Sequence, residues 1–474
     1  MAFLTTTLNV ILLILVIVTL FNIIIFVHEL GHFLAAKWRG LQVDRFQIWF
    51  GKPIWKTEWR GVQYGLGWIP AGGFVALPQM APMEAIEGGE RGGSAPALPP
   101  ISPMDKIIVA FAGPLFSMLL ALSCALIVTQ VGKPRDFMPE TRIGFVVPGS
   151  PADLAGMQAG DRILTINGSP VDGFQGSLDS IFERIVLSRG DQIRFTVDRP
   201  GEASPVTLTT GFKREKTRWF QRSGLREVGI APAGDVVIGE VMPNSPADRA
   251  GIIPGEKFIS ADGIELFSIS QLTHHMTSRE WQPVTVVVES PADQARRTIT
   301  LTPAAPVEPE GQTPMIGVRW DPGQQIDTRI VHPGPYEQVK DSLRMMWVTL
   351  SSLLSPSSSV GVDQLAGPVG IAQIQYQLLQ TENGWRRVLA FMVLFNVNLA
   401  VLNMLPFPVL DGGHITLAIL EKIARRPVQA RPLEFVQTVC ALALISLMLY
   451  ITSKDIGDNF GRSRAEQPEI KFAE

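Results

Sequence analysis

The sequence predicts a membrane-embedded α-helical bundle of four transmembrane helices, with two small α+β domains inserted between the second and the third. Two observations predict this fold class. Four apolar runs approach the length needed to cross a bilayer, and the long segment between the second and third runs contains an internal repeat. A length of 474 residues with 46% hydrophobic residues also exceeds what one ordinary soluble domain requires.

The apolar runs contain at most one charged residue each, and about 20 residues at 1.5 Å per residue cover roughly 30 Å of hydrocarbon. They are residues 8–27, 107–131, 388–405 and 433–452. A cleaved signal peptide is the alternative for the first run. That run lacks a basic segment before it and a small-residue cleavage site after it, so we favour a retained helix.

Basic residues near the ends of the spans predict the orientation. No Lys or Arg precedes residue 37, whereas both the loop after the first span and the loop between the last two spans are basic. The positive-inside rule therefore places these two loops in the cytoplasm, with the N-terminus, residues 132–387 and the C-terminal tail outside. Lys454, Arg462 and Arg464 in the tail argue mildly for the opposite orientation.

The net charge of -3 gives no indication of nucleic-acid binding. Both cysteines, Cys124 and Cys440, fall inside predicted spans, so the segment between the second and third spans has none and needs no disulfide. We expect the two cysteines to be packing residues.

The internal repeat pairs residues 143–171 with residues 238–266. Each copy has a β-branched strand, the sequence Ser-Pro-Ala-Asp, a short helical turn ending at Gly156 or Gly251, and a second strand followed by an Asn-Gly or Asp-Gly turn. The second copy begins 95 positions after the first, so each repeat spans about 90 to 100 residues. Two repeats of this length indicate tandem domains rather than a solenoid, whose repeats are shorter and more numerous.

This pattern resembles PDZ domains of the bacterial type. The resemblance implies that peptide C-termini bind by adding a strand to a sheet edge, near residues 228–232 and 316–320. The alternative is that both domains only pack against or space the membrane part, because a fold does not by itself establish ligand binding.

The stretch HELGH lies at the end of the first span. In a helix His28 and His32 share a face, so their imidazoles can bind one metal ion, and Glu29 is placed to activate a water molecule. Polar side chains are costly at membrane depth, which favours a functional reading. A hydrogen-bonded pair of histidines inside the bundle is the alternative.

A catalytic zinc site requires a third protein ligand and an open position. The third span leads into NMLPFPVLDGGH, residues 403–414, on the same predicted side as the end of the first span. Asp411 and His414 both suit zinc. Broken backbone at membrane depth is tolerated only where it is buried or lines a polar cavity.

Together these motifs resemble the site-2 protease family of intramembrane zinc metalloproteases. The resemblance extends over nearly the whole chain and includes FAGPL at 111–115 and LAGPVGI at 365–371. It implies that His28, His32 and Asp411 bind Zn²⁺ and that Glu29 is the catalytic base. It also implies substrate contacts, which it assigns to Asn403, Pro406, Gly72 and Gly73. Relatives often have Asn where this chain has Ser117.

The same resemblance implies the setting. The protein would be a multi-pass protein of the bacterial inner membrane, with its N-terminus and both PDZ domains periplasmic and its active site near the cytoplasmic face. Its substrates would be single-span membrane proteins already trimmed by an upstream site-1 protease, such as anti-sigma factors, and remnant signal peptides.

Two other function classes fit parts of the sequence less well than a protease does. A PDZ scaffold with a non-catalytic metal site would have no need of Glu29. A transporter would show an inverted repeat of spans, which the sequence lacks.

Three further segments carry expectations. Residues 61–78 alternate aromatic and aliphatic side chains between Gly and Pro, which predicts a β-hairpin or loop at the membrane face. The family resemblance implies that this element pairs with substrate. A hairpin with a purely structural role is the alternative. Residues 87–103 have the composition of a flexible linker. Residues 335–354 place Val339, Leu343, Met346, Trp347, Leu350 and Leu354 on one face of a helix, either in the outer interface or against the bundle.

These expectations divide the chain into nine segments: 1–37, 38–103, 104–132, 135–233, 234–323, 324–386, 387–432, 433–453 and 454–474.

Overall fold

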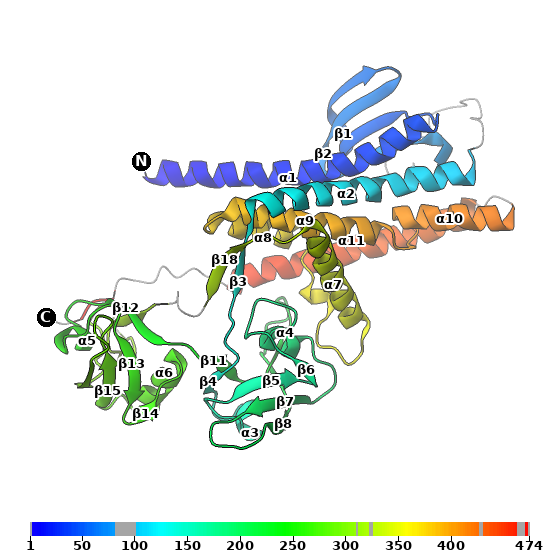
Figure 1. Cartoon of the computed structure of the whole chain (residues 1–474). Coiled ribbons are helices and arrows are strands. Elements are labelled where there is room, and N and C mark those ends of the chain that lie inside the picture. Colours follow the sequence, from blue (N-terminus) through cyan, green and yellow to red (C-terminus); the bar gives the residue numbers. More distant parts are fainter. Residues whose placement is uncertain are drawn as a thin grey trace. The chain divides into compact units, whose positions relative to one another are not determined.

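The computed structural model describes residues 2–80, 101–309, 311–321, 326–425, 430–461 and 470–472 (Figure 1). The chain forms two compact units. A membrane unit comprises Met1–Pro134, Ile330–Val348 and Ala366–Ile456, and a β-rich unit comprises Arg135–Arg329, Thr349–Leu365 and Gly457–Glu474. Residues 87–100 of the predicted linker lie outside the described residues.

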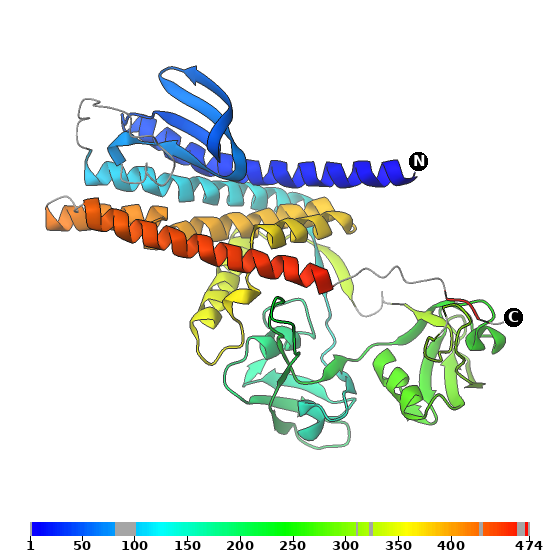
Figure 2. The same cartoon turned by 180° about the vertical axis from the view of Figure 1, so that it is seen from behind.

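The membrane unit contains the four helices that are long and apolar enough to cross a bilayer, as predicted. The spans are Thr7–Trp38, Pro103–Val131, Gly384–Asn403 and Pro432–Asp458. They belong to α1 (Ala2–Trp38), α2 (Pro103–Val131), α9 (Gly384–Asn403) and α11 (Ala430–Gly461). Helix α2 contacts α1, α9 and the shorter α10 (Asp411–Ala424), and Figure 2 shows these helices side by side. Cys124 is buried among them.

A further helix, α8 (Pro368–Gln380), begins within the LAGPVGI motif. Its N-terminus is capped by Asp455 of α11, whose Oδ2 accepts hydrogen bonds from Gly367 N at 3.1 Å and Gly370 N at 2.8 Å. Asp455 is only 1% exposed. A carboxylate is favourable at a helix N-terminus, where backbone N–H groups lack helical partners. A Cβ atom at Gly370 would come within 2.5 Å of Asp455 Oδ1, which explains the glycine.

The predicted hairpin within residues 61–78 is wrong in detail. Strand β2 (Val62–Ala76) pairs with the preceding strand β1 (Arg45–Trp59) across a turn at Arg60 and Gly61. Residues 63–66 and residues 73–76 of β2 both pair with residues 45–48 of β1. These two parts of β2 therefore lie on opposite sides of β1 and do not pair with each other. The basic residues of 45–60 are typical of a cytoplasmic loop, so the sequence does not predict the strand that lies between these two parts of β2.

Helix α7 (Pro335–Leu354) has the predicted bounds, but its buried face differs from the predicted apolar stripe. Gln338, Ser342 and Met346 are buried, whereas Trp347 is 73% exposed. Gln338 Nε2 donates to Ala125 O of α2 at 3.0 Å and to Pro333 O at 2.9 Å. The polar residues are buried because their side chains satisfy backbone carbonyls, which a hydrophobicity pattern does not register.

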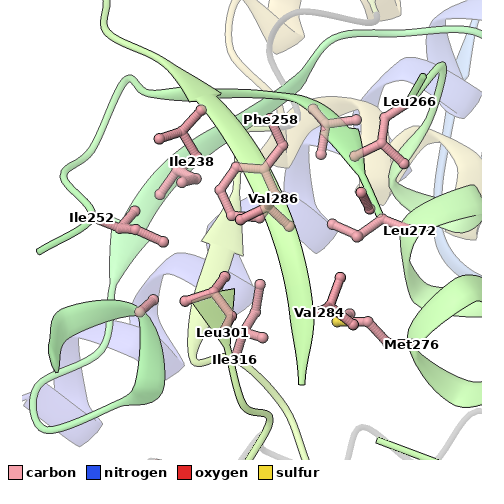
Figure 3. Close-up of a cluster of buried hydrophobic side chains, with 14 residues drawn as sticks. Ile238, Ile252, Phe258, Leu266, Leu272, Met276, Val284, Val286, Leu301 and Ile316 are labelled. Carbon is pink, nitrogen blue, oxygen red and sulfur yellow. The ribbon is translucent and has the colours of Figure 1, made fainter. Parts of the chain in front are cut away.

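The β-rich unit contains two hydrophobic cores. The first lies under the four-stranded sheet β6-β5-β7-β8, the pair β11-β4, and α4. The second lies within the sheet β16-β15-β13-β12-β17, with β14 on β13, and α6; Figure 3 shows Phe258, Leu272 and Val286 in this core. Strand β9 pairs with β10, and β18 pairs with β3.

The bounds of these elements are β3 (Lys133–Phe137), β4 (Ile143–Val146), α3 (Pro151–Leu154), β5 (Arg162–Ile166), β6 (Ser169–Pro170), α4 (Ile181–Val186), β7 (Ile193–Asp198), β8 (Val206–Thr210), β9 (Lys213–Arg214), β10 (Arg226–Glu227), β11 (Ile230–Pro232), β12 (Val236–Val241), α5 (Pro246–Arg249), β13 (Lys257–Ala261), β14 (Ile264–Glu265), α6 (Ile269–Ser278), β15 (Val284–Glu289), β16 (Arg296–Leu301), β17 (Val318–Trp320) and β18 (Asp327–Val331). In the described part of the chain, Pro78–Met80 and Val362–Gln364 form 3₁₀ turns.

The two Ser-Pro-Ala-Asp segments fold alike. Ser150 and Ser245 cap α3 and α5, and their Oγ atoms accept from the backbone N–H three residues on, at 3.3 and 3.1 Å. This is the usual N-cap arrangement, with proline at the first helical position. The C-terminal residues 470–472 also join the unit, because Lys471 exchanges backbone hydrogen bonds with residues 307 and 308 and Phe472 is buried.

Candidate metal centre

The end of α1 presents two imidazoles to one point. His28 and His32 lie one helical turn apart, and their Nε2 atoms are 3.3 Å from each other. Glu29 lies beside them, and all three side chains line one cavity. The sequence pattern predicts this convergence, because residues i and i+4 share a face.

Asp411 reaches the same point from the N-terminus of α10. Its Oδ2 lies 3.3 Å from His28 Nε2, and its Oδ1 lies 3.4 Å from His32 Nε2. The ligand atoms of His28, His32 and Asp411 all lie within 4.8 Å of one another, which is the only such group of three or more potential ligands in the described part of the chain. His414 lines the cavity but does not belong to this group.

The outer ring nitrogens have their own partners. His32 Nδ1 lies 2.8 Å from Val109 O, and His28 Nδ1 lies 2.9 Å from Ser117 Oγ. When the Nδ1 atom of each ring carries the proton and donates it in a hydrogen bond to its own oxygen partner, each Nε2 atom is left with a lone pair. The two lone pairs face one another and the Asp411 carboxylate. Asp411 Oδ2 is buried without a hydrogen-bond partner among the described residues. This convergence of lone pairs fits a cation, and two imidazoles with a carboxylate suit zinc.

Two glycines allow α1 and α2 to approach closely enough. A Cβ atom at Gly31 would lie 2.4 Å from Ala112 O, and one at Gly113 would lie 2.1 Å from His32 Nε2. Real Cβ atoms do not approach so closely. The glycines of HELGH and FAGPL therefore make room for each other's helix, and Gly113 lies directly against the imidazoles.

A cavity of about 320 Å³ opens onto this point. Of the predicted substrate contacts, Asn403, Gly72 and Gly73 line it, whereas Pro406 is not among its lining residues. A Cβ atom at Gly73 would be 2.9 Å from Glu29 Cγ, so β2 runs directly past the glutamate. Three potential metal ligands beside an open cavity are the arrangement expected of a catalytic rather than a structural metal site.

Comparison with known proteins supports this reading. The family model described as peptidase family M50 matches residues 16–447. The chain belongs to peptidase family M50. Family membership favours the protease over the scaffold with a non-catalytic metal site.

Several relatives of this M50 peptidase cover almost its whole length. A protein named Protease RseP from Yersinia pestis is 28% identical over 90% of this chain and 94% of its own. A protein named Regulator of sigma-E protease RseP from Salmonella typhimurium is 26% identical with the same coverage. A Neisseria meningitidis protein named as a zinc metalloprotease is 29% identical over 90% of this chain and 95% of its own. The family match over most of the chain makes this protein a peptidase.

A solved PDZ domain of an SdrC-like protein from Listeria monocytogenes matches 20% of this M50 chain and 93% of its own, with 19% identity and a TM-score of 0.16. At that score the likeness carries no argument about the fold.

Sequence reasoning missed the roles of three residues on α2 in this M50 site. The Val109 carbonyl and the Ser117 hydroxyl lie within hydrogen-bonding distance of the histidine rings, and Gly113 has no side chain that would collide with them. They follow at intervals of four, so they share one helical face, and this spacing was the available signal. In the sequence, Ser117 differs from its neighbours only as a departure from the residue that relatives often have.

Replacing Ser117 by alanine is expected to weaken metal binding by about 10- to 100-fold, because the partner that orients His28 would be lost. Titration of the metal-free protein with zinc against a competing chelator measures this. Ser117→Asn supplies an amide oxygen at the same place and is the matched control, with near-normal affinity expected. Equal affinities for Ser117→Ala and wild type would show that the hydroxyl has no orienting role.

Proposed function

We propose that this M50 peptidase cleaves peptide bonds within transmembrane segments, with zinc held by His28, His32 and Asp411 and with Glu29 as general base. The single observation that carries the proposal is the convergence of the two Nε2 atoms and the Asp411 carboxylate beside Glu29, on helices of a membrane unit. Bound zinc supplies Lewis-acid activation of a water molecule and of the peptide carbonyl.

The residues of the chain perform the remaining steps. Glu29 removes a proton from the attacking water, and the same carboxylic acid then protonates the departing amine. The cavity walls hold the substrate backbone across the site. Asn403 offers an amide to a peptide group, and residues 72–75 of β2 line the cavity.

The substrate must be extended at the scissile bond, because helical carbonyls are engaged in internal hydrogen bonds. Residues 73–76 pair with β1 on one side only among the described residues, so the opposite edge is available for an extended peptide. Glycines at 72 and 73 permit a close approach of the substrate backbone to Glu29.

We further propose that the β-rich unit is a tandem pair of PDZ domains. Strands β11 and β17 each pair with only one neighbour among the described strands, and they lie within the segments 228–232 and 316–320 that are predicted to accept peptide C-termini. Gly229 and Gly317, directly before these strands, have positive φ and pack on the capping serines Ser150 and Ser245. The same arrangement in both domains supports one shared ligand class.

The two proposed PDZ domains lie between the second and the third span of the chain, which supports a role in selecting substrates by size. The domains would admit single-span proteins that a site-1 protease has already shortened, such as anti-sigma factors, and remnant signal peptides. The predicted orientation places these domains in the periplasm and the catalytic site near the cytoplasmic face of the bacterial inner membrane, because the basic loops face inward.

The test compares one single-span substrate with and without its external domain. We expect the full-length wild type in nanodiscs to cleave only the shortened form. Strands β3 and β18 pair, and Thr328 Oγ1 donates to Asp136 at 2.8 Å, so a short linker can replace residues 138–326. This deletion variant, checked for wild-type metal content, should cleave both forms. Equal cleavage of both forms by the wild type would contradict the filter, and no cleavage of either would contradict the proposed substrate class.

A further inference from the structure

A loop of the β-rich unit is fixed at the end of the last membrane span. Arg222 donates to Asp458 through its backbone N at 3.1 Å and its Nη1 at 3.0 Å. A Cβ atom at Gly457 would lie 2.1 Å from Phe220 O, so the loop backbone touches α11 directly. Gly457 and Asp458 are the last two residues of the span Pro432–Asp458. The loop therefore lies beside the end of the helical segment that is long and apolar enough to cross a bilayer.

The side chains beside this contact combine an exposed indole with positive charge. Trp219 is 87% exposed, although tryptophan is usually well buried in a folded protein. All seven residues from 213 to 219 are exposed, and they include four cations and one acid. Lys213 Nζ donates to Gly149 O and Arg214 to Ser359 Oγ.

Lys216 and Arg218 remain available. Among the described residues neither forms an ion pair, and the Arg218 guanidinium only lies 6.0 Å from the ring centre of Phe220. The half-buried Phe220 in turn stacks edge-on against Trp219, at 5.7 Å between ring centroids. Phe220 thus supports the indole from the side of α11, while the indole itself and the two cations face outward.

We propose that residues 213–222 form a membrane-interface anchor, in which Trp219 sits at headgroup depth and Lys216 and Arg218 bind the phosphate groups of anionic phospholipids. Tryptophan prefers this layer because its ring is apolar and its N–H needs a polar partner. Lysine and arginine next to the surface are attracted to anionic headgroups. The anchor would hold the first β-rich domain to the bilayer independently of the peptidase activity.

The position and the charge of residues 213–222 identify anionic lipid as their ligand. The loop is hydrogen-bonded to a residue of a membrane span, so lipid headgroups are its immediate neighbours. A soluble protein partner would also have to displace those headgroups. The net positive charge of the exposed stretch is complementary to anionic lipid.

The test is a depth measurement on the full-length protein in nanodiscs. Cys124 and Cys440 are replaced by alanine, and a nitroxide is attached to Thr217→Cys, which leaves Trp219 in place. Collisions with oxygen report lipid contact, and collisions with a water-soluble nickel chelate report exposure to solvent. The matched control is Leu154→Cys on α3 of the same domain, where the native side chain is 81% exposed.

We expect the label at 217 to favour oxygen over nickel and the label at 154 to show the reverse. Nanodiscs containing phosphatidylglycerol should shift the label at 217 deeper than phosphatidylcholine alone. Trp219→Ser, or Lys216→Glu with Arg218→Glu, should shift it toward water. A label at 217 that is as accessible to nickel as the label at 154 in both nanodiscs would overturn the proposal. Immobilisation of a water-exposed label only after addition of a membrane extract would instead indicate a protein partner.

Discussion

Gly113→Ala is expected to abolish metal binding and, with it, all peptidase activity. The new methyl group would lie 2.1 Å from His32 Nε2 and 2.9 Å from His28 Cε1. Neither ring can rotate away without breaking its hydrogen bond to Val109 O or Ser117 Oγ. The helix itself should tolerate the change, since alanine is a better helix former than glycine.

Metal content per chain and cleavage of a shortened single-span substrate measure this prediction. Ser123→Ala on the exposed face of the same helix is the control, and we expect it to retain both properties. Circular dichroism and thermal unfolding establish that both variants are folded. A folded Gly113→Ala protein that carries wild-type zinc would show that the histidines are not held against α2 as described.

Glu29→Gln is expected to lower the cleavage rate by about 10²- to 10⁴-fold or more, while the bound metal remains. The amide has nearly the shape of the carboxylate but cannot accept the proton of the attacking water. Glu29 is also outside the group His28, His32 and Asp411, so its charge is not needed for metal coordination.

Single-turnover cleavage and metal content, measured on the same preparation, separate the two effects. Asp411→Ala is the informative comparison, because we expect it to lose metal and activity together. Retained activity in Glu29→Gln would require a different base. Lost metal in the same variant would make Glu29 a ligand instead.

The sequence predicts those parts of the fold that depend on local periodicity. The four spans follow from apolar length, and the approach of His28 to His32 follows from helical spacing. The choice between Asp411 and His414 could not be made from residue type, because both suit zinc. The structure separates them, since Asp411 is the first residue of α10 and reaches both imidazoles, whereas His414 lies almost one turn further along.

What the sequence did not reveal depends on contacts between distant segments. The strand at 45–59 is recognised only through its two partners in β2, and its basic residues resemble a cytoplasmic loop. Gln338 is buried because it meets a carbonyl of α2, and Asp455 is buried because it caps α8. Each is a polar group satisfied by a remote backbone atom, and no hydrophobic period encodes such a pair.

X-ray absorption at the zinc edge of the full-length protein tests the central claim most directly. We predict two imidazoles and oxygen ligands, with Zn–N distances of about 2.0–2.1 Å. The spectrum should be unchanged in His414→Ala, while the Asp411→Ala protein should contain little zinc to measure. A shell of three imidazoles that loses one in His414→Ala would contradict the account, because His414 would then be the third ligand in place of Asp411.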